Sequence, residues 1–180
     1  MNGKNNIPVS QPLVSIIIPC MNEEKTIGVC IKKALSTLER EGYEGEIIIS
    51  DNSTDTSRDI AMKLGVKVVI PYNKGYGNAF LEGFRHAKGK YVLLADADDT
   101  YDLTEIRKFL EPLMADKADF VMGTRLRGHI EKGSMPWLHR YIGNPIITST
   151  LNDLFKTHLS DSQCGMRSIV RKEYDKLDLK

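Results

Sequence analysis

Short apolar runs alternate along the chain with longer segments whose apolar residues recur every three or four positions. The apolar runs occupy residues 13–18, 46–50, 66–70, 90–95 and 118–122. They are rich in Ile, Val and Leu and lack polar alternation, which predicts strands buried on both faces. The segments 24–40, 54–64, 76–87 and 104–114 have helical periodicity. The alternation predicts an α/β fold, a Rossmann-like, doubly wound and mostly parallel sheet flanked by helices.

Residues at the ends of these segments predict their limits. Pro19 follows the first apolar run and Pro71 follows the third, and each is expected to end its strand. Ser53 or Thr54 is expected to be the N-cap of the second helix, and Gly65 to end it.

The region after Gly123 differs in pattern from the rest. Helical phase is readable in residues 138–155, where Pro145 interrupts it. This pattern predicts an amphipathic pair of helices, which either packs on the sheet or lies on a membrane surface.

Composition and charge narrow the class of protein. The chain has 180 residues and a net charge of +1, which favours one domain and does not favour a nucleic-acid partner. Residues 123–180 hold ten Lys and Arg against six acidic residues, so this part could face an anion. Three cysteines without C-x-x-C spacing favour buried thiols in a reducing cytoplasm. Residues 1–11 lack a signal-peptide pattern, and no apolar stretch is long enough to span a bilayer.

The strongest chemical signal is the segment Leu93–Asp99, where an apolar run ends in acidic residues. Asp96 and Asp98 follow the predicted strand directly, so both carboxylates can point toward one site. Two carboxylates that close repel each other unless a cation lies between them. Mg²⁺ or Mn²⁺ shared with a phosphate fits this arrangement, whereas the alternative is an exposed acidic turn.

Polar residues also follow the other predicted parallel strands, at the sheet edge where ligands of such folds bind. Asn22 and Glu23 could hydrogen-bond a ribose or a base edge, or Asn22 could cap the next helix. Asp51 could accept a hydrogen bond from a nucleobase, or it could be an ordinary turn residue. Lys74 and Gly75 precede a helix and give a weak phosphate-binding signal.

Arginines in the last third of the chain are candidates for phosphate binding. Arg125, Arg140 and Arg167 come after stretches of otherwise small or apolar residues, and the guanidinium group matches phosphate oxygens. The alternative for each is an arginine on the solvated surface.

Taken together, these segments resemble the family-2 glycosyltransferases, which have the GT-A fold. The matching pieces are IIIPCMNEEKTI, IIISDNSTDTS, NKGYGNA, LLADADDTYD and GTRLRG, in the family's order. MPWLHRYIGN and LFKTHLSDSQCGMRSIVRKEYDKL point to the branch of dolichol-phosphate mannose or glucose synthases and polyprenyl-phosphate glycosyltransferases.

The resemblance implies a nucleotide-diphosphate sugar donor, with either UDP or GDP, and Mg²⁺ or Mn²⁺ held by Asp96 and Asp98. The residues expected to bind the nucleotide sugar are Pro19, Asn22, Glu23, Asp51, Lys74, Gly75, Asp96 and Ala97. Those expected in catalysis are Asp98, Arg125, Arg140, Asp161 and Arg167. Thr100 occupies a position where many relatives have a further metal ligand, and Asp99 and Asp102 are nearby alternatives.

The acceptor decides what Asp161 does. A polyprenyl or dolichyl phosphate is already an anionic nucleophile, so Asp161 would then pair with an arginine. A saccharide hydroxyl would need a carboxylate base, and Asp161 is the candidate. The favoured prediction is an inverting hexosyltransferase that uses a lipid phosphate. The rivals are a nucleotidyltransferase, whose Gly-rich basic loop after strand one is missing here, and a non-catalytic nucleotide-sugar-binding module.

The resemblance also divides the single domain. Residues 1–12 are expected to be a flexible N-terminus, 13–122 to bind the nucleotide sugar and 123–180 to form the acceptor side. Relatives usually continue beyond the position of Lys180, and many end in membrane-spanning helices. The chain is therefore expected to be either a truncated or a naturally short member of this branch. It is expected to act in the cytoplasm, at the inner face of the membrane.

Overall fold

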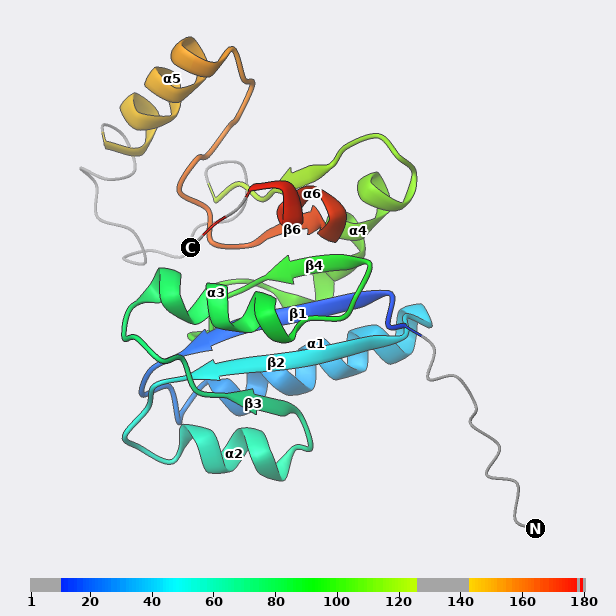
Figure 1. Cartoon of the computed structure of the whole chain (residues 1–180), viewed down its shortest axis with the longest axis vertical. Coiled ribbons are helices and arrows are strands. Elements are labelled where there is room, and N and C mark those ends of the chain that lie inside the picture. The colour runs from blue at the N-terminus through cyan, green and yellow to red at the C-terminus, as the bar shows by residue number, and fades with distance from the viewer. Residues whose placement is uncertain (1–10, 126–142, 178, 180) are drawn as a thin grey trace.

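A six-stranded mixed sheet organises the protein, in a computed structural model that describes residues 11–125, 143–177 and 179 (Figure 1). The strand order is β3-β2-β1-β4-β6-β5. Neighbours among β1 to β4 run parallel, whereas β6 runs antiparallel to both β4 and β5. The strands are β1 Val14–Cys20, β2 Gly45–Asp51, β3 Lys67–Val69, β4 Tyr91–Leu94, β5 Phe120–Met122 and β6 Arg167–Val170. The predicted doubly wound, mostly parallel α/β fold is confirmed.

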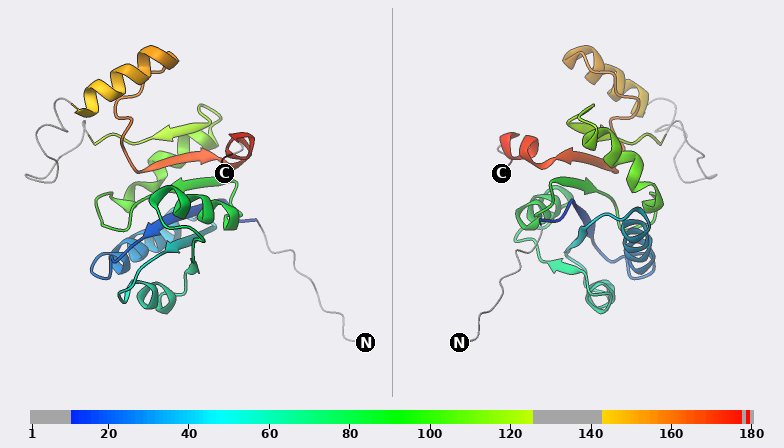
Figure 2. Two further views of the ribbon diagram at one scale, coloured as in Figure 1. Left: turned by 60° about the vertical axis from the view of Figure 1, so that its left-hand side comes forward. Right: turned by 90° about the vertical axis from the view of Figure 1, so that its right-hand side faces the viewer.

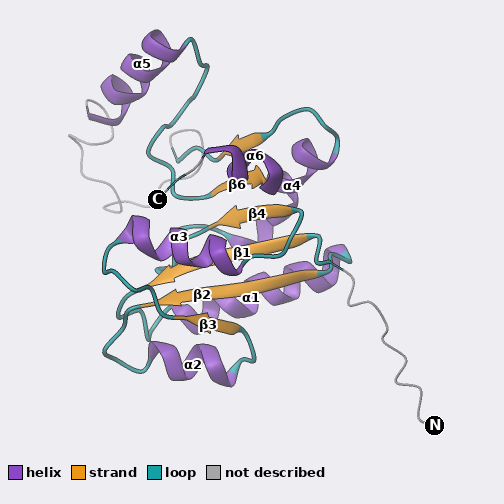
Figure 3. Cartoon of the chain, viewed as in Figure 1, coloured by secondary structure: helices purple, strands orange, loops and turns teal. Residues whose placement is uncertain are grey.

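Helices cover both faces of the sheet (Figures 1 and 3). α1 Ile27–Glu41, α2 Ser57–Lys63 and α4 Ile106–Met114 pack on one face. α3 Tyr76–His86 and the short α6 Arg171–Tyr174 pack on the other, where Phe84 stacks on Tyr174. Two 3-10 turns, η1 Leu103–Glu105 and η3 Asp175–Leu177, precede α4 and follow α6.

The central strands carry the core because their side chains alternate between two buried faces. Ile16 and Ile18 of β1 join the larger cluster beneath α1 and α4. Ile17 points the other way and joins the cluster beneath α3. All three are fully buried, as predicted for a strand covered on both sides.

Pro19 does not end β1, contrary to the prediction. The strand continues through Pro19 to Cys20 and stays paired with β2. The carbonyl of Ile17 accepts a hydrogen bond from Ala95 N on the β4 side, so the nitrogen of Pro19 faces that same side. The missing N–H of Pro19 therefore falls where the β1–β4 ladder ends, and the pairing of β1 with β2 is not interrupted.

The second helix begins later than predicted. α2 starts at Ser57, and neither Ser53 nor Thr54 caps it. Asp55 Oδ1 instead accepts the hydrogen bond from Ser57 N at 2.9 Å. Ser53 and Thr54 are drawn away because they hydrogen-bond to Asn22 in the loop after β1.

The sequence analysis did not predict β6. Its four residues, RSIV, include two polar ones and give too short a pattern to stand out. Because β6 runs against β4, its first residue, Arg167, pairs with Leu94, the last residue of β4. The reversed strand thereby brings the segment before it to the edge where the parallel strands end.

The predicted helical region 138–155 is described only from Gly143 on, and there it contains α5, Asn144–Phe155. Figure 2 shows α5 standing away from the sheet. Across the described residues, no helix is both long enough and apolar enough to cross a bilayer. Cys20, Cys30 and Cys164 are buried and free, which confirms the prediction of buried thiols.

Candidate active site

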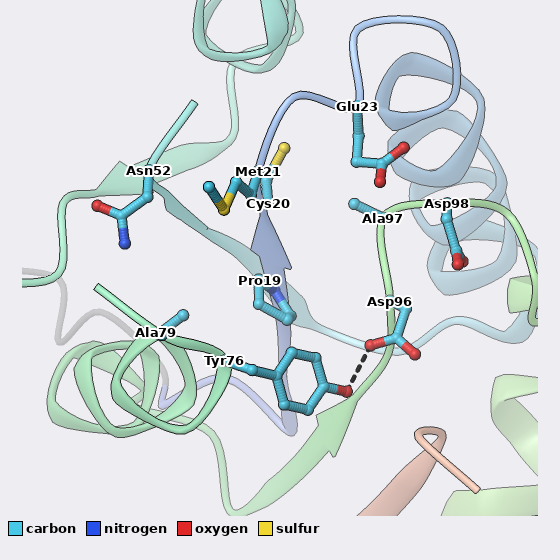
Figure 4. A pocket seen from close by; sticks show the side chains of 11 residues that line it. Pro19, Cys20, Met21, Glu23, Asn52, Tyr76, Ala79, Asp96, Ala97 and Asp98 are labelled. Atoms are coloured by element: carbon cyan, nitrogen blue, oxygen red, sulfur yellow. Dashed lines mark hydrogen bonds between the residues drawn. The ribbon is translucent and has the colours of Figure 1, made fainter. Parts of the chain in front are cut away.

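A cavity of about 420 Å³ opens at the carboxyl-terminal edge of β1, β2 and β4 (Figure 4). The ends of three strands and the first turn of α3 meet there because parallel strands all end on the same side of a sheet. Its lining residues are Pro19, Cys20, Met21, Glu23, Asn52, Gly75, Tyr76, Ala79, Asp96, Ala97 and Asp98. Six of the predicted site residues lie here together: Pro19, Glu23, Gly75, Asp96, Ala97 and Asp98.

Asp96 and Asp98 both line the cavity, as the sequence analysis predicted. The phenolic hydroxyl of Tyr76 donates a hydrogen bond of 2.6 Å to Asp96 Oδ1 (Figure 4). Burial raises the pKa of Asp96; the Tyr76 hydrogen bond lowers it, and the nearby Asp98 charge raises it again, for a net rise. Asp98 is exposed and accepts a hydrogen bond from Thr100 N. An acidic pair with this repulsion favours a cation between its members.

Gly165 lies directly behind Asp96. A Cβ on this glycine would stand 2.5 Å from Asp96 Oδ2, closer than carbon and oxygen approach without a bond. Gly165 N donates a hydrogen bond of 2.7 Å to the hydroxyl of Tyr101, which fixes the segment before β6 against the acidic loop. Burial raises the pKa of Tyr101 to about 12, so this hydroxyl stays protonated at neutral pH.

The residues present fit a divalent metal of the predicted kind. Mg²⁺ is typically held by one or two carboxylates together with substrate phosphates and water, and Asp96 and Asp98 supply two. Among the described residues, no group of three His, Cys, Asp or Glu side chains is placed to hold a metal alone. Asp99 pairs with Lys33, Asp102 accepts from Thr104 N at the start of η1, and neither lines the cavity, so the further metal ligand stays unassigned.

Asn22 connects two loops and neither caps α1 nor lines the cavity. Its backbone is left-handed, with φ of 61°. Asn22 N donates to Ser53 Oγ, and its Oδ1 accepts from Thr54 N at 2.8 Å. Thr26 precedes α1 at the N-cap position. The capping interpretation of Asn22 is therefore wrong, and a role in nucleoside binding stays a prediction.

Asp51 is fully buried at the end of β2. Its Oδ2 accepts from Arg58 Nε of α2 at 2.8 Å, and its Oδ1 accepts from Ser53 N. It is not among the residues that line the cavity. The sequence analysis missed Arg58, which lies seven residues along the chain on a helix that begins later than predicted. Base recognition by Asp51 stays a prediction.

Lys74 and Gly75 lie just before α3. Gly75, with φ of 121°, lines the cavity and is the N-cap residue of the helix. Lys74 is exposed and outside the lining, and its carbonyl accepts from Asn78 Nδ2. Tyr76, the first residue of α3, reaches the acidic pair. It lies in the motif NKGYGNA, but the sequence analysis did not single it out because its side chain is uncharged.

Arg125 and Asp161 form a two-point ion pair. Asp161 is 1% exposed, and its Oδ2 and Oδ1 accept from Arg125 Nε and Nη2 at 2.9 and 3.0 Å. The backbone N–H groups of Arg125 and Gln163 also donate to it. Burial raises the pKa of Asp161, but the hydrogen bonds from Arg125 outweigh this and the net change is a lowering.

Arg167 extends the site on the far side of Asp96. It is half-buried, and its Nε donates to the carbonyl of Cys164 at 2.9 Å. Its positive charge, like that of Arg125, acts on Asp96 and lowers the pKa of that carboxyl. Arg140 lies outside the described residues, so its predicted role stays a prediction.

The mostly parallel sheet, the cavity at its edge and the acidic pair define a GT-A domain, the class that binds nucleotide sugars. A profile of glycosyl transferase family 2 matches residues 15–177, and the chain belongs to this family. Mannosyl-3-phosphoglycerate synthase from Rubrobacter xylanophilus shares the fold, with a TM-score of 0.71 and 21% identity over 89% of this chain and 54% of that one. A Mycobacterium tuberculosis glucosyl-3-phosphoglycerate synthase complex with Mn²⁺, UDP and phosphoglyceric acid superposes with a TM-score of 0.69, at 20% identity over 89% of this chain and 56% of that one.

Two of the curated relatives come from Haloferax volcanii. The low-salt glycan biosynthesis hexosyltransferase Agl6 of Haloferax volcanii is 40% identical over 93% of this chain and 40% of its own length. The dolichyl-phosphate hexose transferase of the same organism is 30% identical over 88% of this chain and 67% of its own. The chain therefore spans well under half the length of Agl6.

Proposed function

We propose that this domain transfers a hexose from a UDP- or GDP-sugar to a polyprenyl or dolichyl phosphate. The observation that carries the proposal is the cavity at the sheet edge, which combines an acidic pair with polar side chains from the neighbouring strand ends. The names of the relatives, a hexosyltransferase and a dolichyl-phosphate hexose transferase, support the reaction class.

The proposed role of each residue follows from its position in the site. Asp96 and Asp98 would hold Mg²⁺ or Mn²⁺, which when bound neutralises charge on the diphosphate leaving group. Glu23 and Asn52, on the β1 and β2 side of the cavity, would hydrogen-bond the nucleoside. Arg167 would face phosphate oxygens across Asp96, because guanidinium groups match them in geometry and charge.

The state of Asp161 supports a phosphate acceptor over a sugar hydroxyl. A general base needs a free lone pair and a pKa near the working pH. Asp161 accepts four hydrogen bonds, is buried, and has a lowered pKa. A lipid phosphate needs no base, and its attack opposite the leaving group inverts the anomeric centre. Asp161 then serves to hold Arg125.

Calorimetric titration tests the donor site. The full chain is titrated with UDP, GDP, UDP-glucose and GDP-mannose, first with Mn²⁺ and then with EDTA. We expect micromolar binding of one nucleotide that is lost with EDTA. Asp98→Ala should abolish it, whereas Asp59→Ala, which removes an exposed acid from α2, should not. Absence of binding to every nucleotide would refute the proposal.

Transfer is tested separately, with the nucleotide sugar that binds and dolichyl phosphate in detergent. We expect a glycosylated lipid product, and Asp98→Ala should lower its rate at least about 100-fold. Donor binding without transfer would identify a non-catalytic binding module. Transfer to a saccharide hydroxyl instead would restore Asp161 as the candidate base.

A further inference from the structure

Helix α1 contacts the acidic loop through side chains that do not line the cavity. Asp99, the residue after Asp98, has left-handed backbone geometry with φ of 60°. Its carboxylate pairs with Lys33 of α1, with Nζ at 2.8 Å from Oδ1 and 3.1 Å from Oδ2. The two side chains are about one-third exposed, at 34% and 31%. The two adjacent carboxylates thus have different contacts: Asp98 lines the cavity, whereas Asp99 forms an ion pair with Lys33 of α1.

A second contact comes from one turn earlier on the same helix. Cys30 Sγ lies 3.4 Å from the carbonyl oxygen of Ala97, the residue between the two cavity carboxylates. Cys30 is fully buried and Ala97 is 3% exposed. Because Cys30 and Lys33 are three residues apart, they project from the same face of α1. The loop is therefore held at residues 97 and 99, on either side of Asp98.

The helix is a rigid support for these contacts. α1 has 15 residues, and Ile27, Ile31 and Ala34 are fully buried in the larger core cluster. The backbone of α1 from which Lys33 projects therefore cannot shift without disturbing the core. Asp96 and Asp98 repel each other, and a left-handed residue next to them is an unfavourable backbone conformation unless contacts fix it.

We infer that Lys33 and Asp99 are positioning residues for the metal site. This inference rests on the proposed function. Their ion pair fixes the backbone turn after Asp98 and so keeps the Asp98 carboxylate aimed into the cavity beside Asp96. Neither residue lines the cavity, so in this role neither would contact the metal or the donor. The residues that support metal-binding side chains from behind have a strong effect on affinity, typically tenfold to a hundredfold.

Mn²⁺ binding to the full chain tests this role without any turnover. Electron paramagnetic resonance measures free Mn²⁺, with the metal alone and with UDP or GDP added. Lys33→Met and Asp99→Asn should each weaken Mn²⁺ binding about tenfold, and the double variant should be no weaker than either single one. Lys33→Arg, which keeps the charge, should restore most of the affinity.

Matched controls separate the ion pair from other effects. Lys32→Met removes the same charge from the exposed neighbouring position of α1, to which the described part of the chain gives no ion pair, and it should leave Mn²⁺ binding unchanged. Asp99→Gly keeps a residue that tolerates the left-handed backbone but removes the pair, and it should bind Mn²⁺ as weakly as Asp99→Asn. Thermal unfolding midpoints should stay within about 3 °C of wild type, since the pair is partly exposed.

The outcomes distinguish this inference from the function on which it rests. If wild type binds no Mn²⁺ under any of these conditions, the proposed function fails and the inference fails with it. If wild type binds and Lys33→Met behaves like Lys32→Met, the metal site stands and the positioning role is overturned. Wild-type affinity in Asp99→Gly would also overturn it, because the turn alone would then suffice.

Discussion

At the scale of single residues, the surroundings of each carboxylate decide what it can do. Asp96 and Asp98 face a cavity and are left with mutual repulsion, whereas Asp51 and Asp161 are buried against arginines. From the sequence alone, all four are acidic residues at predicted strand ends or in loops. Asp51 and Asp161 are already paired within the fold, with Arg58 and Arg125. Asp96 and Asp98 face the cavity and remain available to a ligand.

Asp161→Asn should destabilise the protein and make its free energy of unfolding depend less on pH in the acidic range. Because the folded pKa is lowered, ionised Asp161 stabilises the fold above about pH 4, the usual pKa of an aspartate. That stabilisation is lost progressively as the pH falls from there toward the folded pKa. We expect a loss of about 3 kcal/mol at pH 7, measured by urea unfolding from pH 7 to pH 3. Equal wild-type and variant stability at pH 7 would contradict this.

At the scale of elements, the packing of α3 on β1 determines the shape of the cavity. Gly83 lies against β1, and a Cβ there would stand only 2.2 Å from Ile17 Cγ2. The close approach fixes the distance of α3 from the sheet, and with it the position of Tyr76 in the first turn of the helix. The hydrophobic pattern predicted α3 to within one residue of its end, but it could not predict that Gly83 sets the helix–sheet distance.

Gly83→Ala and Gly77→Ala form a matched pair on α3. Gly83→Ala should destabilise the fold by about 1–3 kcal/mol, because the added methyl group meets fully buried Ile17. A Cβ at Gly77 meets nothing within 4 Å, so Gly77→Ala should stabilise by about 0.5–1 kcal/mol through helix propensity. Chemical denaturation of both variants checks the signs. A stable Gly83→Ala would mean that α3 can shift on the sheet.

The sequence predicted the fold well where structure is local, and it predicted that several polar residues would gather where the parallel strands end. The four parallel strands and the helices between them follow from periodicity, and the cavity follows from their shared edge. β6, Gly165 and the Lys33–Asp99 pair could not be predicted, because each depends on segments more than 60 residues apart meeting in space. Asn22 was misjudged because its partners, Ser53 and Thr54, lie in another loop, 31 and 32 residues along the chain.

At the scale of the whole molecule, α5 is the element with least support from the sheet. It stands apart in both views of Figure 2. Its large apolar side chains Ile146, Ile147, Leu154 and Phe155 are between 45% and 70% exposed. If residues 123–180 form the acceptor side, as predicted, these apolar side chains would suit the proposed lipid-phosphate acceptor, which lies in a membrane.

Vesicle binding tests this face as a membrane contact. The full chain is sedimented with vesicles of phosphatidylcholine and phosphatidylglycerol. Leu154→Gln with Phe155→Gln should weaken binding at least about tenfold, since each exposed apolar side chain contributes roughly 1–2 kcal/mol on burial. The control pair, Met62→Gln with Ile70→Gln, removes apolar side chains of 61% and 60% exposure elsewhere and should bind as wild type does. Equal loss in both pairs would show that α5 has no special contact with lipid, and the acceptor would then have to reach the domain by another surface.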